Sequence, residues 1–313
     1  MILSVSRRTD VPAYYSEWFI NRIKEGVLCV RNPMNPHQVS RIELSPEVVD
    51  CIVFWTKNPL PMLHRLKELK DYTYYFQFTL TGYGKEVEPN VPHKRDEMIP
   101  AFLKLSKQIG KERVIWRYDP IFFSEIYTEE YHLKAFKQIA EALQGYTETC
   151  VISFLDWYAK IDRNLQTLGV QQKKEQEIKA FARKISSIAK RYGLQILSCA
   201  EKYDLEECGI MHGHCIDRHL IERLLGCQLE AYKDKNQRPV CGCMESIDVG
   251  TYNTCPNGCK YCYANHSMSS VLKNAEAYDV HSLLLCGKLL EGDKVTQRKV
   301  KSSQSGKQQI LDI

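Results

Sequence analysis

The sequence lacks a long apolar run. None approaches the roughly 18 residues that cross a membrane, and even the stretch 48–55 is interrupted by Asp50. The first residues show no basic stretch followed by an apolar one, so no signal peptide is expected. We therefore expect a protein without a membrane partner, located in the cytoplasm, where clustered cysteines are more often metal ligands or catalysts than disulfides.

The sequence also has little net charge, with 43 Lys and Arg against 38 Asp and Glu, a formal net charge of +5. Six basic and three acidic residues in 288–313 account for most of that excess, which leaves the rest of the chain nearly neutral. A nearly neutral chain argues against nucleic acid as a partner. The phosphate-binding loop Gly-x-x-x-x-Gly-Lys-Ser/Thr is absent as well, which removes the commonest nucleoside-triphosphate interpretation.

Strand and helix patterns alternate through the first 200 residues. One clear helical pattern places Ile178, Phe181, Ala182 and Ile185 on one face and ends near Gly193. Short apolar runs predict strands at 2–6, 27–30, 51–55, 73–80, 114–118, 150–154 and 195–199.

This alternation predicts a parallel sheet in an α/β fold. At 313 residues the favoured architecture is a (βα) barrel, complete or partial and TIM-like, with a C-terminal cysteine-rich metal-binding segment. We divide the chain into a barrel core (1–205), a cysteine-rich iron–sulfur segment packed on the barrel mouth (206–290) and a disordered basic tail (291–313).

Charged residues recur just after the predicted strands. In (βα) barrels the carboxyl ends of the strands form the rim of the active site, so these charges predict a polar pocket. The cations would bind a carboxylate or another anion, and the carboxylates would handle protons or hydroxyl groups. The alternative is that loops after strands are exposed and therefore polar in any case. The candidate catalytic residues are Arg7, Asp10, Lys57, Arg117, Asp119, Asp156 and Glu201.

Cysteine is abundant: the chain has 13, and eight of them fall between Cys208 and Cys262, where even scattering would place about two. Within this stretch Cys255, Cys259 and Cys262 have the spacing Cys-x3-Cys-x2-Cys. Three thiolates in a tight loop suit three irons of a [4Fe–4S] cluster, which leaves the fourth iron without a protein ligand. Tyr261 would shield such a cluster from solvent. A structural zinc site is the alternative.

The same loop, with an aromatic residue before its last cysteine, resembles the cluster loop of the radical S-adenosylmethionine (radical SAM) superfamily. The resemblance implies that Cys255, Cys259 and Cys262 hold the cluster. It also implies that the open iron binds S-adenosylmethionine, whose reductive cleavage yields a radical that abstracts hydrogen from the substrate. The chain departs from that superfamily in two ways: the loop lies near the C-terminal end, and no Gly-Gly pair is present for a Gly-Gly-Glu type motif.

A wider stretch resembles an uncharacterised bacterial family catalogued as a domain of unknown function, with radical-SAM-like cysteines at its C-terminal end. That resemblance spans nearly the whole chain but implies no substrate. The residues that carry it are 233–238, Cys241-Gly-Cys243, 248–252 and 255–264.

The remaining cysteines of the stretch predict a second site. Cys208, Cys215, Cys241 and Cys243 would be sufficient for a second, fully ligated cluster. Alternatively, His212 and His214 would complete a zinc site with Cys215, or Cys241 and Cys243 would only strengthen the first site. Cys199, at a strand end, is a further possible ligand. The other cysteines fit packing positions: Cys29, Cys51, Cys150, Cys227 and Cys286.

Three functions follow. The first is an iron–sulfur enzyme of radical SAM type, acting on an unknown small-molecule or peptide substrate and served by an electron donor. The second is a protein that binds zinc or a cluster without catalysis, as an interaction or structural module. The third is a radical-based enzyme that modifies or repairs nucleic acid, against which the near-neutral body argues.

Overall fold

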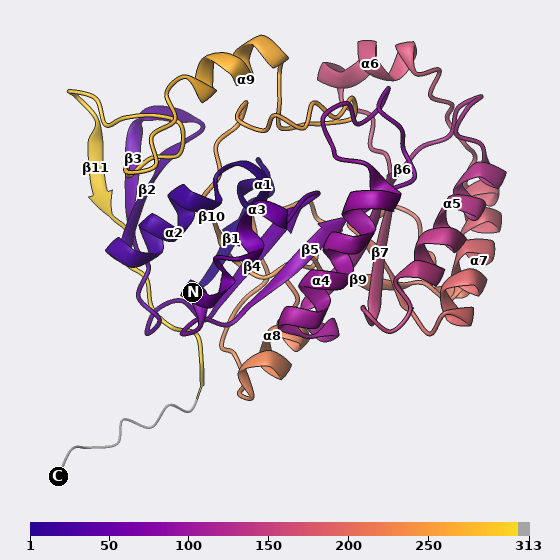
Figure 1. Cartoon of the computed structure of the whole chain (residues 1–313), viewed down its shortest axis with the longest axis horizontal. Coiled ribbons are helices and arrows are strands. Elements are labelled where there is room, and N and C mark those ends of the chain that lie inside the picture. Colours follow the sequence, from indigo (N-terminus) through magenta and orange to yellow (C-terminus); the bar gives the residue numbers. More distant parts are fainter. Residues whose placement is uncertain (306–313) are drawn as a thin grey trace.

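The computed structural model describes residues 1–305 and shows a mixed α/β protein built on one eight-stranded sheet (Figure 1). All neighbouring strands of this sheet are parallel, as the alternating pattern predicts. In spatial order the strands are β10 (Ile247–Asp248), β1 (Ile2–Val5), β4 (Cys51–Thr56), β5 (Tyr74–Thr79), β6 (Val114–Ile121), β7 (Thr149–Phe154), β8 (Gln195–Cys199) and β9 (Met211–Gly213).

A second, three-stranded sheet holds the predicted strand 27–30, which therefore does not join the main sheet. Here β2 (Val27–Asn32) pairs antiparallel with β3 (Asn35–Glu43). Only two residues separate these strands, and such a short connection forms a hairpin, whereas a parallel neighbour needs a crossover of a dozen residues or more.

The third strand of that sheet, β11 (Lys294–Gln297), pairs parallel with β3. The polar composition of 291–313 predicted a disordered tail, but β11 within it is paired in this sheet. Backbone pairing to a free strand edge does not require apolar side chains. Ser303 also accepts a hydrogen bond from the Glu230 amide through its carbonyl, at 2.6 Å. Residues 306–313 of the predicted tail lie outside the described part of the chain.

Helices cover one face of the main sheet. The predicted helix 178–192 is α7, and its buried face, Ile178, Phe181, Ala182 and Ile185, is the predicted one. The α-helices are α1 (Val11–Tyr14), α2 (Ser16–Glu25), α3 (Leu60–Leu63), α4 (Ile99–Ile109), α5 (Glu129–Ala142), α6 (Asp162–Thr167), α7 (Glu175–Arg191), α8 (Arg218–Leu225) and α9 (Met268–Ala275). Shorter helical turns are η1 (Leu66–Leu69), η2 (Lys94–Met98), η3 (Lys111–Arg113), η4 (Ala159–Ile161) and η5 (Glu206–Cys208).

The two faces of the sheet bury different side chains, because successive residues of a strand point to opposite sides. On the helix-covered face, aromatic side chains such as Trp116 of β6 and Phe136 of α5 stack at 4.7 Å between ring centroids. The opposite, inner face buries a second apolar cluster that includes Val53 and Tyr75. Five cysteines belong to that inner cluster or pack against it: Cys51, Cys199, Cys215, Cys241 and Cys243.

The edge strands β9 and β10 do not pair with each other within residues 1–305. The residues that follow β9 and those that precede β10 are nevertheless hydrogen-bonded to each other, since the Met244 amide donates to the Ile216 carbonyl at 3.1 Å. Because β9 and β10 belong to the same sheet as β1, the predicted division at residue 205 runs through this sheet.

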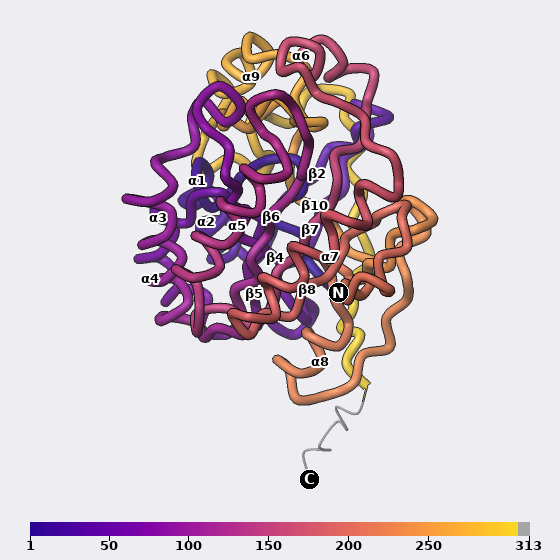
Figure 2. The backbone as a smooth tube through the Cα atoms, turned by 90° about the vertical axis from the view of Figure 1, so that its right-hand side faces the viewer, coloured from indigo at the N-terminus to yellow at the C-terminus, as the bar shows by residue number. Residues whose placement is uncertain are grey.

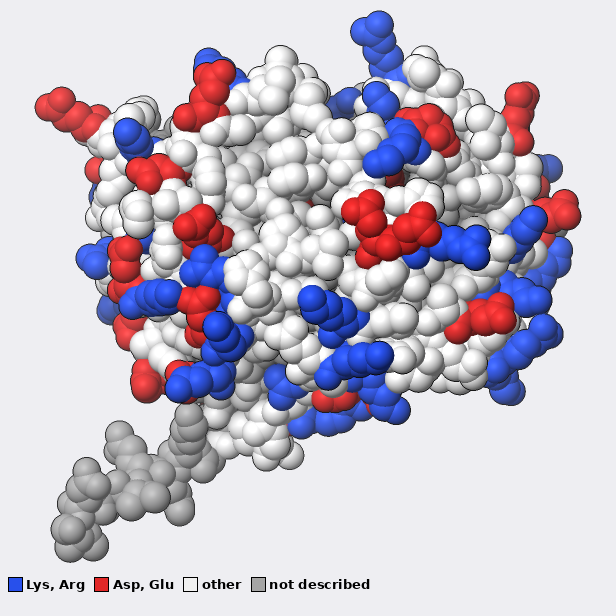
Figure 3. Space-filling view, viewed as in Figure 1, with Lys and Arg blue, Asp and Glu red and all other residues white. Residues whose placement is uncertain are grey.

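Figures 1 and 2 both place α6 and α9 at one end of the molecule and α8 at the opposite end. In the space-filling view, acidic and basic side chains are interspersed over the visible face, with no large field of one sign (Figure 3). Among residues 1–305, no helix is both long enough and apolar enough to cross a membrane.

Candidate functional site

The predicted cluster loop lies at the carboxyl ends of the central strands. Residues 250–266, orange in Figure 1, cross between α9 and α6 at the end of the molecule. Three hydrogen bonds tie the loop to segments that follow β1 and β5: Asn257 Nδ2 to Asp10 Oδ2 at 3.1 Å, Asn90 Nδ2 to the Pro256 carbonyl at 2.7 Å, and the Lys260 amide to the Val87 carbonyl at 2.9 Å. The loop therefore covers the edge where the polar pocket was predicted.

The three cysteines of the loop lie within electrostatic range of one another. Burial, together with the charges of Asp10 and Cys262, raises the pKa of Cys255 to about 12. Burial also raises the pKa of Cys259. The charge of Lys57 lowers this pKa, whereas Cys255 and Cys262 raise it. The Cys262 Sγ accepts a hydrogen bond from the Ala264 amide at 3.3 Å, the type of contact that tunes cluster thiolates.

Three sulfurs on one short loop suit a cluster that leaves one iron open. Across residues 1–305, however, no group of three or more His, Cys, Asp or Glu side chains is already arranged as a metal site.

A buried ionic cluster contacts the cysteine loop through Tyr261. Glu88, in the segment after β5, is 1% exposed and receives Lys57 Nζ at 2.7 Å together with the ammonium of Lys94. The Tyr261 hydroxyl accepts from Lys57 Nζ at 2.8 Å and donates to Glu88. Tyr261 was predicted to shield a cluster. In the structure its hydroxyl instead anchors the cysteine loop to these two charges.

We expect the Glu88 carboxylate to make stability depend on pH. Burial alone would raise its pKa, but Lys57 and Lys94 outweigh burial and hold the pKa at about 2, against 4.5 for an ordinary glutamate. Its contribution, on the order of 3 kcal/mol, is therefore present above about pH 4.5 and is lost as the pH falls toward 2. The unfolding free energy of the wild type should exceed that of Glu88→Gln most at neutral pH, and this gap should close between pH 4.5 and 2.

Urea unfolding curves between pH 2 and 7 measure that gap. Glu141→Gln is the matched control, because Glu141 is exposed, and its curve should run parallel to that of the wild type. Parallel curves for Glu88→Gln and wild type would contradict the ion-pair assignment.

Two aspartates join the start of the chain to the loop. Asp10 caps α1 by accepting from the Ala13 amide, and it also accepts from the Thr56 hydroxyl at 2.7 Å. Asp248, in β10, accepts from Ser4 Oγ at 2.7 Å and Ser6 Oγ at 2.6 Å. Asp10 accepts four hydrogen bonds in all, and it therefore acts as a positioning residue for the strand ends.

Each of the three predicted anion-binding cations is paired with a carboxylate within the protein. Arg117 binds Asp119 through both ends of its guanidinium, with 3.0 Å from Nε to Oδ1, and its Nη1 lies 2.9 Å from Cys215 Sγ. Lys57 is paired with Glu88. Arg7 is less engaged: its Nε lies 3.8 Å from Asp248, and its guanidinium lies over the Trp55 ring at 5.8 Å.

A cavity of about 180 Å³ opens at the carboxyl ends of β6, β7 and β8. Two predicted site residues line it, Asp156 and Glu201. Burial raises the pKa of Glu201, although its carboxylate accepts the Phe154 amide at 2.9 Å and the Lys202 amide at 2.8 Å. Asp156 is paired with Arg238. This cavity is the place within residues 1–305 where predicted rim carboxylates face open space.

The predicted second cysteine set is wrong in one member. Cys208 lies on the helix-covered side of the sheet, where its thiol contacts the Lys179 carbonyl at 3.5 Å. Cys199 takes its place beside Cys215, with the two Sγ atoms 2.8 Å apart. Cys199 is the last residue of β8, and the alternation of side chains along that strand places it on the inner face. Cys208 lies in η5, next to α7.

Two buried carboxylates of this region, Glu88 and Asp248, were not among the predicted site residues. A sequence pattern could have identified Glu88, because this residue precedes Pro89 in the same way as the predicted site residue Asp119 precedes Pro120. No such pattern marks Asp248, because its strand has only two residues.

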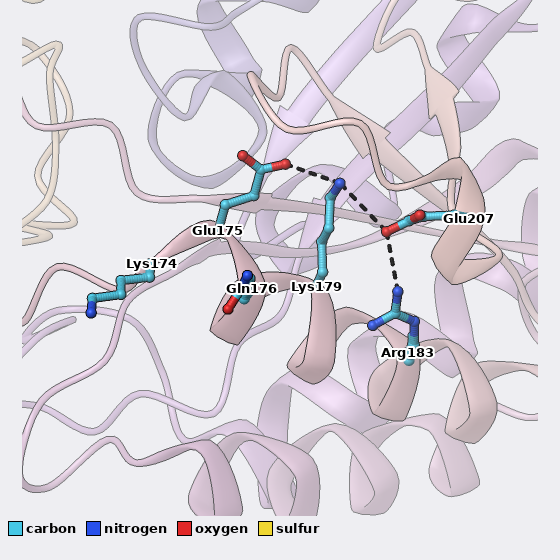
Figure 4. A pocket seen from close by; sticks show the side chains of 6 residues that line it. All are labelled: Lys174, Glu175, Gln176, Lys179, Arg183 and Glu207. Carbon is cyan, nitrogen blue, oxygen red and sulfur yellow. Dashed lines mark hydrogen bonds and ion pairs between the residues drawn. The ribbon is translucent and has the colours of Figure 1, made fainter.

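A second surface hollow lies away from this site, along the start of α7. Its acidic and basic side chains pair with one another: Lys179 Nζ is 2.9 Å from Glu175 and 3.4 Å from Glu207, which also receives Arg183 at 3.1 Å (Figure 4). These pairs are exposed and contribute little. We therefore place no functional site there.

Comparisons with known proteins add a family. Residues 2–264 match the model of a family described as Domain of unknown function (DUF1848). No match was found among the curated proteins. Eight chains of solved structures match, among them a "putative alpha-L-fucosidase" from Bacteroides thetaiotaomicron with 12% identity and a TM-score of 0.25, covering 56% of this chain and 71% of that chain. A likeness at that TM-score carries no argument about the fold or the activity.

Proposed function

We propose that this chain, which belongs to the family described as Domain of unknown function (DUF1848), is an iron–sulfur enzyme resembling the radical SAM enzymes. One observation carries the proposal: the loop with Cys255, Cys259 and Cys262 lies across the carboxyl ends of the strands, beside buried charges. That position is the active-site rim of (βα) proteins.

The three loop cysteines are the residues that would hold the cluster. When bound, the cluster supplies a one-electron reductant with one iron open to S-adenosylmethionine. The Lys57, Glu88 and Tyr261 contacts orient the loop. Arg7, with its incompletely engaged guanidinium, is the cation that would bind a carboxylate of cofactor or substrate.

The cavity beside β6–β8 is the proposed substrate site. Glu201, with its raised pKa, would hold a proton near a bound hydroxyl or amine. The lining combines aromatic side chains such as Phe123 and Phe154 with polar ones such as Gln171 and Lys202, which suits a small polar metabolite or one peptide side chain. The substrate itself stays open, and an electron donor is the implied partner.

Anaerobic reconstitution with iron and sulfide tests this function. We expect at least about four irons per chain, a reduced-state EPR signal that changes when S-adenosylmethionine is added, and formation of 5′-deoxyadenosine on reduction. An unchanged signal together with no 5′-deoxyadenosine would reject the radical SAM assignment.

Variants then localise the cluster. Cys259→Ala should lose about four irons and all cleavage of S-adenosylmethionine, because the remaining two thiolates do not hold a cubane. The matched control is Cys227→Ala, a half-buried cysteine outside the loop, which should keep the full iron content. Equal iron in both variants would show that the loop is not the site.

A structural metal site is the second candidate. The pairing of Lys57 with Glu88 and of Arg117 with Asp119 favours it, because these rim charges are already satisfied within the protein. About one zinc per chain, colourless protein and no effect of S-adenosylmethionine would establish that function in place of the enzyme.

A further inference from the structure

Four cysteines from three chain segments meet on the inner face of the sheet. Cys199 ends β8, Cys215 follows β9, and Cys241 and Cys243 precede β10. The Sγ atoms of Cys199 and Cys215 are 2.8 Å apart. Cys243 extends the group, because its side chain lies near those of both Cys215 and Cys241. The four sulfurs therefore form one connected group.

The group is buried beside two arginine–aspartate pairs, Arg117 with Asp119 and Arg7 with Asp248. Cys215, Cys241 and Cys243 are 7%, 6% and 1% exposed. The Arg117 guanidinium lies 2.9 Å from Cys215 Sγ, and the charge of Arg7 acts on both Cys215 and Cys243. Packing alone explains a single buried cysteine. It does not explain four cysteine side chains gathered from three segments of the chain, an arrangement that suits a metal with four thiolate ligands.

The half-buried imidazole of His214 lies against the same group. His214 Nδ1 is buried and makes no hydrogen bond within the described residues. Its ring occupies the space beside Gly242, so that a Cβ at position 242 would overlap the imidazole. His212, in contrast, is engaged, since its Nε2 lies 2.7 Å from the Val240 carbonyl. The Cys-Gly-Cys turn thus brings His214 to the edge of the sulfur group, where metal ligands usually have a polar neighbour.

We propose that Cys199, Cys215, Cys241 and Cys243 form a second metal site, closed by four protein thiolates and separate from the Cys255–Cys262 loop. The site would bind a thiophilic metal through four sulfur ligands, either one zinc ion or the iron of a fully ligated cluster. Tetrahedral zinc with Zn–S bonds of about 2.3 Å separates its sulfurs by roughly 3.8 Å, so Cys199 and Cys215 must move apart by about 1 Å on binding.

The site would join the two unpaired edges of the sheet. Cys199 and Cys215 belong to the β8–β9 edge, and Cys241 and Cys243 lead into β10 at the other edge. Metal bonds between these segments would hold the edges together where backbone pairing does not.

Metal analysis of anaerobically purified chains separates this site from the cluster loop. A variant with Cys215→Ser and Cys243→Ser should lose one zinc, or about four irons, relative to the wild type. A variant with Cys255, Cys259 and Cys262 changed to alanine should keep that metal. Cys227→Ser is the control and should match the wild type. Zinc in the retained fraction identifies a mononuclear site, and iron with equal sulfide identifies a second cluster; either outcome supports the four-thiolate site.

A measurement on a chain whose four inner cysteines are unchanged covers the case in which the double variant fails to fold. X-ray absorption at the edge of the metal retained by the loop triple variant should show four sulfur neighbours at about 2.3 Å. Metal content unaffected by Cys215→Ser with Cys243→Ser would overturn the proposal. A Cys199–Cys215 disulfide in a metal-free chain would overturn it as well. Loss of all metal in the loop triple variant, with none left for the four thiols, would overturn this site while leaving the proposed function intact.

Discussion

Replacing Arg117 with methionine is expected to lower the free energy of unfolding by about 3–5 kcal/mol. The guanidinium is almost fully buried and binds the Asp119 carboxylate through two groups, while Nη1 also contacts Gln77 and Cys215. Methionine replaces the aliphatic part of the side chain but leaves a poorly solvated carboxylate without its counter-charge. The penalty is therefore the cost of that isolated charge rather than the strength of the pair.

Chemical denaturation at pH 7 measures the loss. A second variant, with Arg117→Met and Asp119→Asn together, should recover a substantial part of it, because no uncompensated charge remains. Arg113→Met is the matched control, since Arg113 is half-buried and its nearest carboxylate is 3.9 Å away; it should cost less than about 1 kcal/mol. A loss of under 1 kcal/mol for Arg117→Met would contradict the buried pair.

Replacing Asp248 with alanine is expected to cost at least about 3 kcal/mol. Its carboxylate accepts four hydrogen bonds, from the hydroxyls of Ser4 and Ser6 and from the amides of Arg7 at 2.9 Å and Gly250 at 3.0 Å. Both serines are buried, so their hydroxyls would lose a partner that water does not replace. The pairing of β10 with β1 should weaken with them, because these bonds hold the start of the cysteine loop against the first strand.

Hydrogen exchange and denaturation together check this expectation. The Val249 amide, which donates to the Ser4 carbonyl at 3.0 Å, should exchange faster in Asp248→Ala than in the wild type. Asp248→Asn keeps the shape and one acceptor and should lie between the two. Asp71→Ala, at an exposed position, should leave both measurements unchanged. Unchanged protection at Val249 would show that the carboxylate does not support this edge.

The predictable part of the fold is the part whose information is local. Strands such as 51–55 and 114–118 are runs of β-branched and aromatic residues, and the buried stripe of α7 repeats at the helical period. The strand 27–30 was assigned to the wrong sheet, because a run of four apolar residues carries no information about its partner. Strands β9 and β10 are too short to produce a pattern at all.

The candidate site divides in the same way. The Cys255–Cys262 loop is visible in the spacing of its residues, because adjacent ligands lie on one turn of chain. Two of the charges predicted at the carboxyl edge stand at strand ends, Lys57 directly after β4 and Asp119 near the end of β6. Which charge pairs with which was not visible, since Glu88 reaches Lys57 across 31 residues.

The cysteines show most clearly where local information ends. Residue order and spacing alone determine the parallel α/β architecture, the buried face of α7 and a three-cysteine loop, because each depends on residues a few positions apart. The tertiary structure replaces Cys208 by Cys199 beside Cys215, pairs Arg117 with Asp119 against that sulfur, and brings Cys241 and Cys243 to the same place. These contacts join segments far apart in the chain, and their partners are chosen by sheet order and side-chain direction, which only the folded chain defines.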